Sequence, residues 1–141
     1  MISYFNQDID FKLKGKLINN QWLKLVAESE IRRIGDINII FCSDNYILDV
    51  NMKYLGLDYF TDIITFDYTE GNKIAGDLFI SLDTVRTNAE QFGQEYATEL
   101  HRVIIHGILH LCGINDKGPG EREIMEAEEN KALALLNDKI K

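Results

Sequence analysis

Residues 106–116 read HGILHLCGIND, and this stretch decides how the sequence is interpreted. At 3.6 residues per turn, His106 and His110 lie one turn apart on the same face of a helix, so both imidazoles can bind one metal ion. Gly113 suits a left-handed cap that ends the helix, after which the backbone turns back and Asp116 supplies an oxygen ligand. Two nitrogens and one carboxylate leave a fourth position for water, which is typical of catalytic zinc sites.

The helix that carries these histidines, predicted over residues 95–112, is apolar on nearly every side and is therefore expected to be buried. Buried imidazoles without partners are costly, and a metal ion accounts for both of them. The alternative is that each histidine is only packed and hydrogen-bonded. His101 lies about 140° around the helix from His106, so it is predicted to be an ordinary core histidine.

Length and composition predict one domain, residues 1–141, of a soluble globular protein. Hydrophobic residues make up 45% and charged residues 27%. No apolar run approaches the roughly 20 residues of a membrane span, and the first ten residues do not resemble a secretory signal. Two cysteines are too few for a disulfide framework, so we expect a cytoplasmic protein without a membrane partner.

The net charge of −8 is unevenly distributed along the chain. Residues 1–60 carry seven Lys and Arg against eight Asp and Glu, whereas residues 61–141 carry eight against fifteen. A polyanion would therefore bind at a local basic patch rather than over the whole surface. The candidates are Lys12, Lys14 and Lys16, and the pair Arg32 and Arg33, although solvated surface side chains are the simpler interpretation.

Hydrophobic periodicity predicts an α+β fold in which a small mixed β-sheet packs against helices. The histidine motif adds the expectation of a zincin-like metal site on a central helix. The predicted strands are residues 2–6, 36–42, 63–69 and 74–81, and the predicted helices are residues 15–30, 44–54, 83–92, 95–112 and 121–136. Asp44 is the expected cap of the second helix. The expected apolar stripes are Leu17, Ile18, Trp22, Leu25 and Val26 on the first helix, and Met125, Ala132 and Leu136 on the last.

The spacing H-x3-H-x5-D, with Gly113 three residues after the second histidine, is similar to the metzincin signature. Metzincin peptidases need a glutamate directly after the first histidine as the general base. Gly107 occupies that position here and cannot accept a proton. A peptidase mechanism therefore loses its base, although the ligands for the metal remain.

The same segment, followed by Asp116, resembles the signature of the YbeY family of metal-dependent endoribonucleases, which act in ribosomal RNA maturation. The resemblance covers roughly residues 36–136. Other segments that resemble the family are Asn51-Met52-Lys53-Tyr54, Thr61-Asp62-Ile63-Ile64-Thr65-Phe66, Gly76-Asp77-Leu78-Phe79-Ile80-Ser81, and Met125 with Glu129. Two positions depart from the family pattern: Asp116 stands where histidine is commonest, and Leu55 stands where an arginine is frequent.

The resemblance implies that His106, His110 and Asp116 bind one divalent transition metal, zinc by preference, while the general base is left unassigned. Four further residues are candidates near the metal or in a substrate cleft walled by residues 74–81. Phe79 would stack on a base or pack in the core, and Ser81 shares its face of the strand. Asp77 would orient a metal-bound histidine or a loop, or stabilise a turn. Glu129 would reach inward or form a surface ion pair. Cys112, within the histidine segment, is expected to be a small buried hydrophobe rather than a metal ligand.

The predicted function is a single-strand-specific endoribonuclease that matures the 3′ end of small-subunit ribosomal RNA and acts in ribosome quality control. The implied partners are ribosomal RNA, the small ribosomal subunit and an Era-type GTPase. Two alternatives stay open at this point. One is a ribosome-assembly factor whose metal only supports the fold, and the other is a metallohydrolase that acts on another class of substrate.

Overall fold

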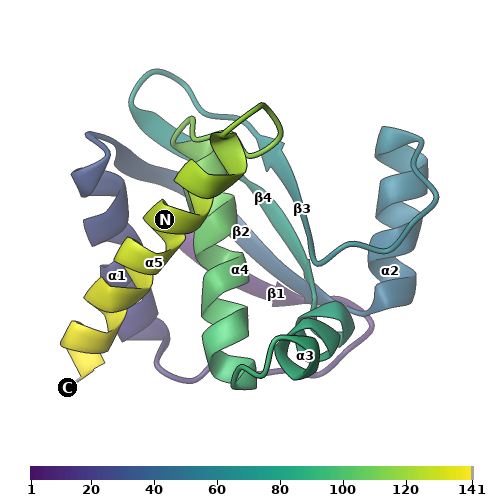
Figure 1. The fold of residues 1–141 in the computed structure, drawn as a ribbon. Helices are drawn as coiled ribbons and strands as arrows, with labels where there is room; N and C mark the ends of the chain where they lie inside the picture. Colours follow the sequence, from purple (N-terminus) through teal and green to yellow (C-terminus); the bar gives the residue numbers. More distant parts are fainter. Residues whose placement is uncertain (141) are drawn as a thin grey trace.

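The computed structural model describes residues 1–140 and arranges them as a four-stranded sheet with helices on both sides (Figure 1). The strands are β1 (Ile2–Asn6), β2 (Arg33–Cys42), β3 (Ile63–Asp67) and β4 (Lys73–Ser81). The helices are α1 (Lys16–Ser29), α2 (Asp44–Val50), α3 (Leu82–Gln91), α4 (Tyr96–Leu111) and α5 (Glu121–Ile140), and a π-helical turn, η1 (Asn51–Leu55), continues α2. Every predicted strand and helix is present, with shifts of a few residues at their ends.

The sheet is mixed, as the sequence predicts. Its strand order is β1-β2-β4-β3. The pairs β1–β2 and β2–β4 are parallel, and β3–β4 is an antiparallel hairpin. Parallel neighbours need a crossover connection, and α1 supplies it between β1 and β2. The α+β class is therefore confirmed.

Helix α4 lies against the middle of the sheet and α5 lies across α4 and α1 (Figure 1). The close approach of α4 depends on two glycines. A Cβ on Gly107 would lie 2.8 Å from Ile63 Cδ1 and 3.0 Å from Leu78, and a Cβ on Gly76 of β4 would lie 3.0 Å from Leu111. Because neither glycine has a Cβ, the helix that carries the predicted metal ligands packs directly against β3 and β4.

Alternation along β4 separates the two faces of the sheet. Ile74, Leu78 and Ile80 are fully buried in the main core under α1, α4 and α5. Phe79 points to the opposite face and packs with the second cluster beside α2. Side chains at alternate positions of β4 therefore face different environments, and only one face adjoins α4.

Two details of the sequence prediction are wrong. In α1, Leu17 is 71% exposed and Leu25 is 43% exposed, whereas Leu23 and Ala27 are fully buried. The helix is rotated from the predicted stripe because it packs beneath α5, where Trp22 donates a hydrogen bond to the Ala132 carbonyl at 2.7 Å. The predicted stripe of α5 is buried as expected.

The second detail is the cap of α2. Ser43, rather than Asp44, caps this helix, because its Oγ accepts a hydrogen bond from the Tyr46 amide. Asp44 instead accepts hydrogen bonds from Ser81 and Thr84 and so ties α2 to the start of α3. Within residues 1–140, no helix is both long enough and apolar enough to cross a membrane.

Candidate functional site

His106 is at the centre of a charged cluster where α4 faces α5 and the loop after α4. Its Nε2 lies 3.2 Å from Oδ2 of Asp116, and its Nδ1 lies 2.6 Å from Oε2 of Glu129. The His106 side chain keeps 27% of its surface exposed, so a solute can reach it. Two carboxylates therefore hold the imidazole, one at each ring nitrogen.

Glu129 is fixed on both of its oxygens. Arg102 Nη1 donates to Glu129 Oε1 at 2.9 Å, while Oε2 faces His106. The other guanidinium nitrogen of Arg102 donates to Oδ1 of Asn130 at 2.7 Å. Glu129 is only 7% exposed, so burial also restricts its movement. A carboxylate held in this way sets the orientation and the tautomer of the imidazole it contacts.

The distance between Nε2 of His106 and Oδ2 of Asp116 is close to the distance expected between two ligand atoms of one cation. Donors about 2.1 Å from a tetrahedral ion lie roughly 3.4 Å apart, and the observed separation is 3.2 Å. When Nδ1–H donates to Glu129, Nε2 carries a lone pair that faces a carboxylate oxygen. Two acceptors this close need a positive charge between them, which is either a proton on Nε2 or a metal ion.

The electrostatics of the cluster favour positive charge on this imidazole. Burial by itself lowers the pKa of His106. The hydrogen bond and charge of Glu129, together with the charges of Asp116 and Asp62, outweigh burial and raise that pKa above its ordinary value. A proton and a metal ion would compete for the same nitrogen.

His110 lies one helical turn beyond His106 and is half-buried. Its ring does not complete a cluster, because among residues 1–140 no group of three or more His, Cys, Asp or Glu side chains is arranged to hold a metal ion. The structure thus brings together two of the three predicted ligands. The assignment of His106, His110 and Asp116 as a zincin-like metal site stays a prediction.

Two carboxyl groups that the sequence analysis did not single out belong to the same neighbourhood. Burial raises the pKa of Asp62, which precedes β3, and the charge of Glu129 raises it further while His106 lowers it. Burial likewise raises the pKa of Glu99, which is 5% exposed on α4. A signal was present in the sequence: Glu99, Arg102, His106 and His110 recur at helical spacing and form one polar stripe on an otherwise apolar helix.

Comparisons with known proteins identify the family. The family model described as endoribonuclease YbeY matches residues 2–137. The chain belongs to the YbeY family. The endoribonuclease YbeY of Parabacteroides distasonis is 64% identical over 140 residues, covering 99% of each chain. That of Phocaeicola vulgatus is 66% identical over 137 residues, covering 97% of this chain and 99% of the relative.

The YbeY fold is also found among solved structures. The solution structure of TM1509 from Thermotoga maritima has a TM-score of 0.65 and is 28% identical, covering 96% of this chain and 89% of that one. The resemblance stated from the sequence is therefore confirmed, as is the α+β fold.

Three candidate residues of this YbeY family member lie on β4 and face away from α4. Oδ1 of Asp77 accepts a hydrogen bond from Asn38 of β2 at 2.9 Å, so it joins two strands and does not contact His106. Phe79 stacks on Tyr46 with ring centroids 6.3 Å apart and is part of an aromatic cluster. These positions follow from the alternation of β4, since Leu78 between them is the residue that meets α4.

Ser81, the third of these residues, stabilises the fold at the start of α3. It is fully buried, its Oγ accepts a hydrogen bond from the Thr84 amide at 3.3 Å, and it donates to Asp44 at 2.6 Å. It therefore caps α3. Among the four candidates named beyond the metal ligands, only Glu129 contacts a predicted metal ligand in the part of the chain that the structure describes.

Gly107 explains why this YbeY sequence does not carry the metzincin glutamate. The position faces β3 and β4 rather than the charged cluster, and the space for a side chain is filled by Ile63 and Leu78. His101 packs edge-on against Trp22, with ring centroids 5.7 Å apart. Cys112 is buried, and burial raises the pKa of its thiol to about 11. Neither side chain is placed to contribute to the cluster around His106.

Proposed function

We propose that this protein is a metal-dependent endoribonuclease that cleaves single-stranded segments of ribosomal RNA precursors, including the 3′ end of the small-subunit RNA. The observation that carries the proposal is the imidazole of His106, held between Asp116 and Glu129 in a member of the YbeY family. The relatives named above are endoribonucleases by name. An accessible imidazole nitrogen that faces a carboxylate oxygen supplies two suitable donors for a divalent ion, and such an ion can promote phosphodiester cleavage.

His106, His110 and Asp116 are the residues that would hold the ion. Two imidazole nitrogens and a carboxylate oxygen are suitable zinc ligands and leave one position open. Helix positions four residues apart have Cβ atoms about 5–6 Å from each other, so His106 and His110 lie on one face of α4, near enough to share one ion. When bound, the ion supplies a Lewis acid for a phosphoryl oxygen and lowers the pKa of a water molecule.

The remaining residues of the cluster orient groups and hold protons. Glu129 accepts the Nδ1 proton of His106 and so directs the Nε2 lone pair towards Asp116. Arg102 keeps Glu129 in position. Asp62, whose pKa burial raises, binds a proton at its carboxylate more readily than an exposed aspartate does, which suits it to accept one during the reaction.

The proposal extends to the setting in which the protein acts. It places the protein in the cytoplasm, in ribosome quality control, with the small ribosomal subunit and an Era-type GTPase as partners. The position that an arginine often occupies in the family is Leu55 here, with 48% of its surface exposed. Another cation must therefore contact the RNA phosphates.

Cleavage of a labelled small-subunit RNA precursor by the purified, zinc-loaded protein tests the function. We expect cuts in single-stranded segments, little cleavage of a duplex of the same sequence, and loss of cleavage in His106→Ala and His110→Ala. His101→Gln, on the same helix but outside the polar stripe, is the control and should keep its activity. Zinc content is measured in every sample, and both inactive variants should hold less zinc.

Three results would contradict the proposal. Equal cleavage by wild type and His106→Ala would exclude this site. Faster hydrolysis of a peptide or an ester than of RNA would favour the other metallohydrolase. Normal precursor ends in cells that carry only His106→Ala, mapped on their ribosomal RNA, would argue for an assembly factor without catalysis.

A further inference from the structure

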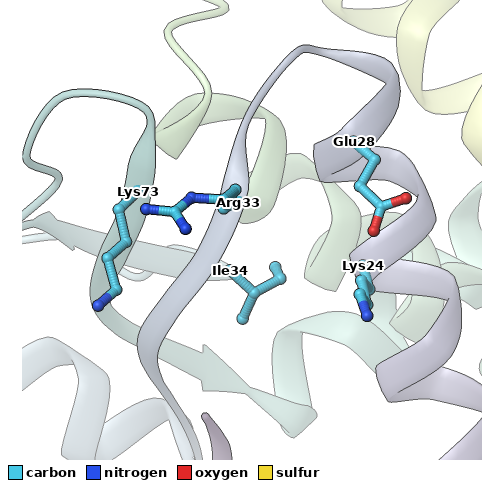
Figure 2. Close-up of a pocket in the computed structure, with 5 residues that line it drawn as sticks. All are labelled: Lys24, Glu28, Arg33, Ile34 and Lys73. Carbon is cyan, nitrogen blue, oxygen red and sulfur yellow. The ribbon is translucent and has the colours of Figure 1, made fainter.

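A basic groove lies between α1 and the first residues of β2 and β4, separate from the cluster around His106. It has a volume of about 260 Å³ and is lined by Lys24, Glu28, Arg33, Ile34 and Lys73. Figure 2 shows Ile34 at its centre, with Lys24 and Glu28 on α1 to one side and Arg33 and Lys73 to the other. The groove therefore has cationic walls and an apolar floor.

The groove continues into a second hollow. That hollow, of about 180 Å³, shares Lys24 and Ile34 with the first and adds Ile2 and Asn20. The two hollows therefore adjoin at Lys24 and Ile34, and their linings reach from Lys73 of β4 to Ile2 of β1. Two adjoining hollows suit a segment of chain better than one small ligand.

The charge of the groove is unusual for this protein. Three cations and one carboxylate line it, whereas the whole chain carries a net charge of −8. Lys24, Arg33 and Lys73 are exposed, and within residues 1–140 none of them forms an ion pair. Three cations beside one carboxylate leave an excess of positive charge in the groove, and a bound anion would offset that excess.

The surroundings of His106 carry an excess of negative charge instead. Asp62, Asp116 and Glu129 act on His106, the Glu99 carboxyl lies near Asp62 and Glu129, and Arg102 is already paired with Glu129. A polyanionic substrate is repelled by such a cluster unless cations elsewhere hold it. The substrate of the proposed reaction therefore needs an anchor outside the site.

The groove and the site are connected through Arg32. Its side chain donates to the Gly71 carbonyl at 2.9 Å in the turn before β4, and its guanidinium would lie 3.4 Å from a Cβ on Gly113. Gly113 is three residues before Asp116, so their Cα atoms are at most about 11 Å apart. Arg33, the next residue after Arg32, lines the groove. Basic side chains thus extend from the groove towards the loop that carries Asp116.

We propose that this groove binds the phosphate backbone of the single-stranded RNA whose cleavage is proposed above, and so serves as an anchoring subsite for the acidic site. Lys24, Arg33 and Lys73 contact phosphates, while Ile34 and Ile2 offer apolar contact to a base or a ribose. Glu28 opposes binding. The inference rests on the proposed function and adds a location for the substrate at residues that take no part in the chemistry.

The test measures binding of wild type and variants to a fluorescent single-stranded 2′-O-methyl RNA that cannot be cleaved through its 2′-hydroxyl, over a range of salt concentrations. Each phosphate contact to a single strand contributes about 0.7 to the slope of log affinity against log salt. The triple variant Lys24→Gln, Arg33→Gln, Lys73→Gln should lower that slope by about 2 and weaken binding at least about tenfold at 0.1 M salt. Glu28→Gln should have the opposite effect and tighten binding.

A second triple variant, Lys12→Gln, Lys14→Gln, Lys16→Gln, is the matched control, because it changes the rival basic stretch that the sequence predicts. It makes the same change in net charge at exposed lysines outside the groove, so its affinity should stay within about threefold of wild type if contacts are local. Because every substituted side chain is exposed, each single substitution should change stability by no more than about 0.5 kcal/mol, and thermal melting of every variant checks that the fold is kept. Cleavage of unmodified RNA is measured on the same samples.

The outcomes separate the groove from the proposed function. Equal weakening in both triple variants shows a general charge effect and overturns the anchoring subsite, as does unchanged or weaker binding in Glu28→Gln. If wild type cleaves RNA and the groove variant binds it equally well, the subsite is wrong while the endoribonuclease proposal stands. If wild type neither binds nor cleaves RNA, both proposals fail. If inorganic phosphate displaces the RNA when its concentration equals that of the RNA, the groove is a site for free anions instead.

Discussion

The ring of His106 meets a carboxylate at each nitrogen, and this pairing determines how the residue titrates. Burial opposes a charged imidazole, whereas Glu129, Asp116 and Asp62 favour it and prevail. His101, five residues earlier on the same helix, has the opposite balance, because burial against Trp22 lowers its pKa without a carboxylate to compensate. Two histidines of one helix are thus expected to titrate on opposite sides of the ordinary value of 6.5.

Titration of the metal-free protein, followed by NMR of the imidazole carbons, should place the midpoint of His106 above that of His101. The same shift affects stability. A histidine whose pKa is raised on folding binds its proton more tightly in the folded state, so its contribution is complete below the unfolded pKa. That contribution disappears as the pH rises through the raised value of the folded protein.

Urea unfolding at a series of pH values measures this effect. The difference in unfolding free energy between wild type and His106→Gln should therefore shrink as the pH rises from below 6.5 into the alkaline range. A difference that grows with pH, or a midpoint of His106 below that of His101, would show that burial outweighs the carboxylates.

At the scale of elements, the contact between α4 and the hairpin β3–β4 positions the site, and Gly76 lies where the two hairpin strands and α4 meet. A Cβ at Gly76 would lie 2.3 Å from the Phe66 carbonyl oxygen and 3.0 Å from Leu111. The carbonyl belongs to the backbone of the paired strand, so it cannot move away as a flexible side chain does. Gly76→Ala should therefore destabilise the fold by about 1–3 kcal/mol in urea unfolding.

Lys73→Ala is the control for this prediction, because it changes an exposed side chain of the same strand and should alter stability by less than about 0.5 kcal/mol. If Gly76→Ala were as stable as wild type, β3 and the Leu111 side chain would have to move away from position 76 at no cost. The close packing around Gly76 would then not be what fixes the hairpin under α4.

The sequence predicts where helices and strands occur better than it predicts which side of each one is buried. The helix α4 and its end at Gly113, with φ of 97°, follow from apolar content and a glycine cap. The buried face of α1 does not, because leucines lie on several sides of that helix and its packing partner α5 comes more than ninety residues later. Periodicity identifies an amphipathic helix, whereas tertiary contacts select which apolar residues are covered.

The same limit applies to the site. Spacing on one helix predicts that His106 and His110 share a face, and a glycine followed by Asp116 predicts a returning loop. The approach of Glu129 from α5 and of Asp62 from the start of β3 depends on how three elements meet, which local pattern does not encode. Asp77 and Phe79 could have been placed from the sequence alone. Neighbouring residues of a strand point to opposite faces, so both lie on the face opposite to that of Leu78.

Over the whole molecule, charge is divided between two places. The carboxylates around His106 suit a cation, and the groove beside α1 suits an anion. An acidic site can bind a metal ion and still act on RNA if the phosphates are held by a separate basic surface. The net charge of −8 is therefore compatible with a nucleic-acid substrate.

The main hydrophobic core is built from apolar side chains of the helices and the sheet. Its largest buried side chains, including Trp22, Phe41 and Ile104, belong to α1, β2 and α4 and form one cluster with residues of α5. The charged cluster lies at the margin of this core, where His106 and Asp116 remain partly exposed. Removal of metal should therefore leave the fold intact while it stops RNA cleavage.

Chelation followed by circular dichroism, thermal melting and an RNA cleavage assay checks this prediction. The metal-free protein should keep its helical spectrum and melt cooperatively at a lower temperature. Zinc added back at about one hundred times its dissociation constant should restore roughly 2.7 kcal/mol of stability through binding to the folded state alone. In His110→Ala that gain should be much smaller, because one of the three proposed ligands is missing. Loss of the helical spectrum on chelation would instead mean that the ion supports the fold, and the core described above would not be sufficient by itself.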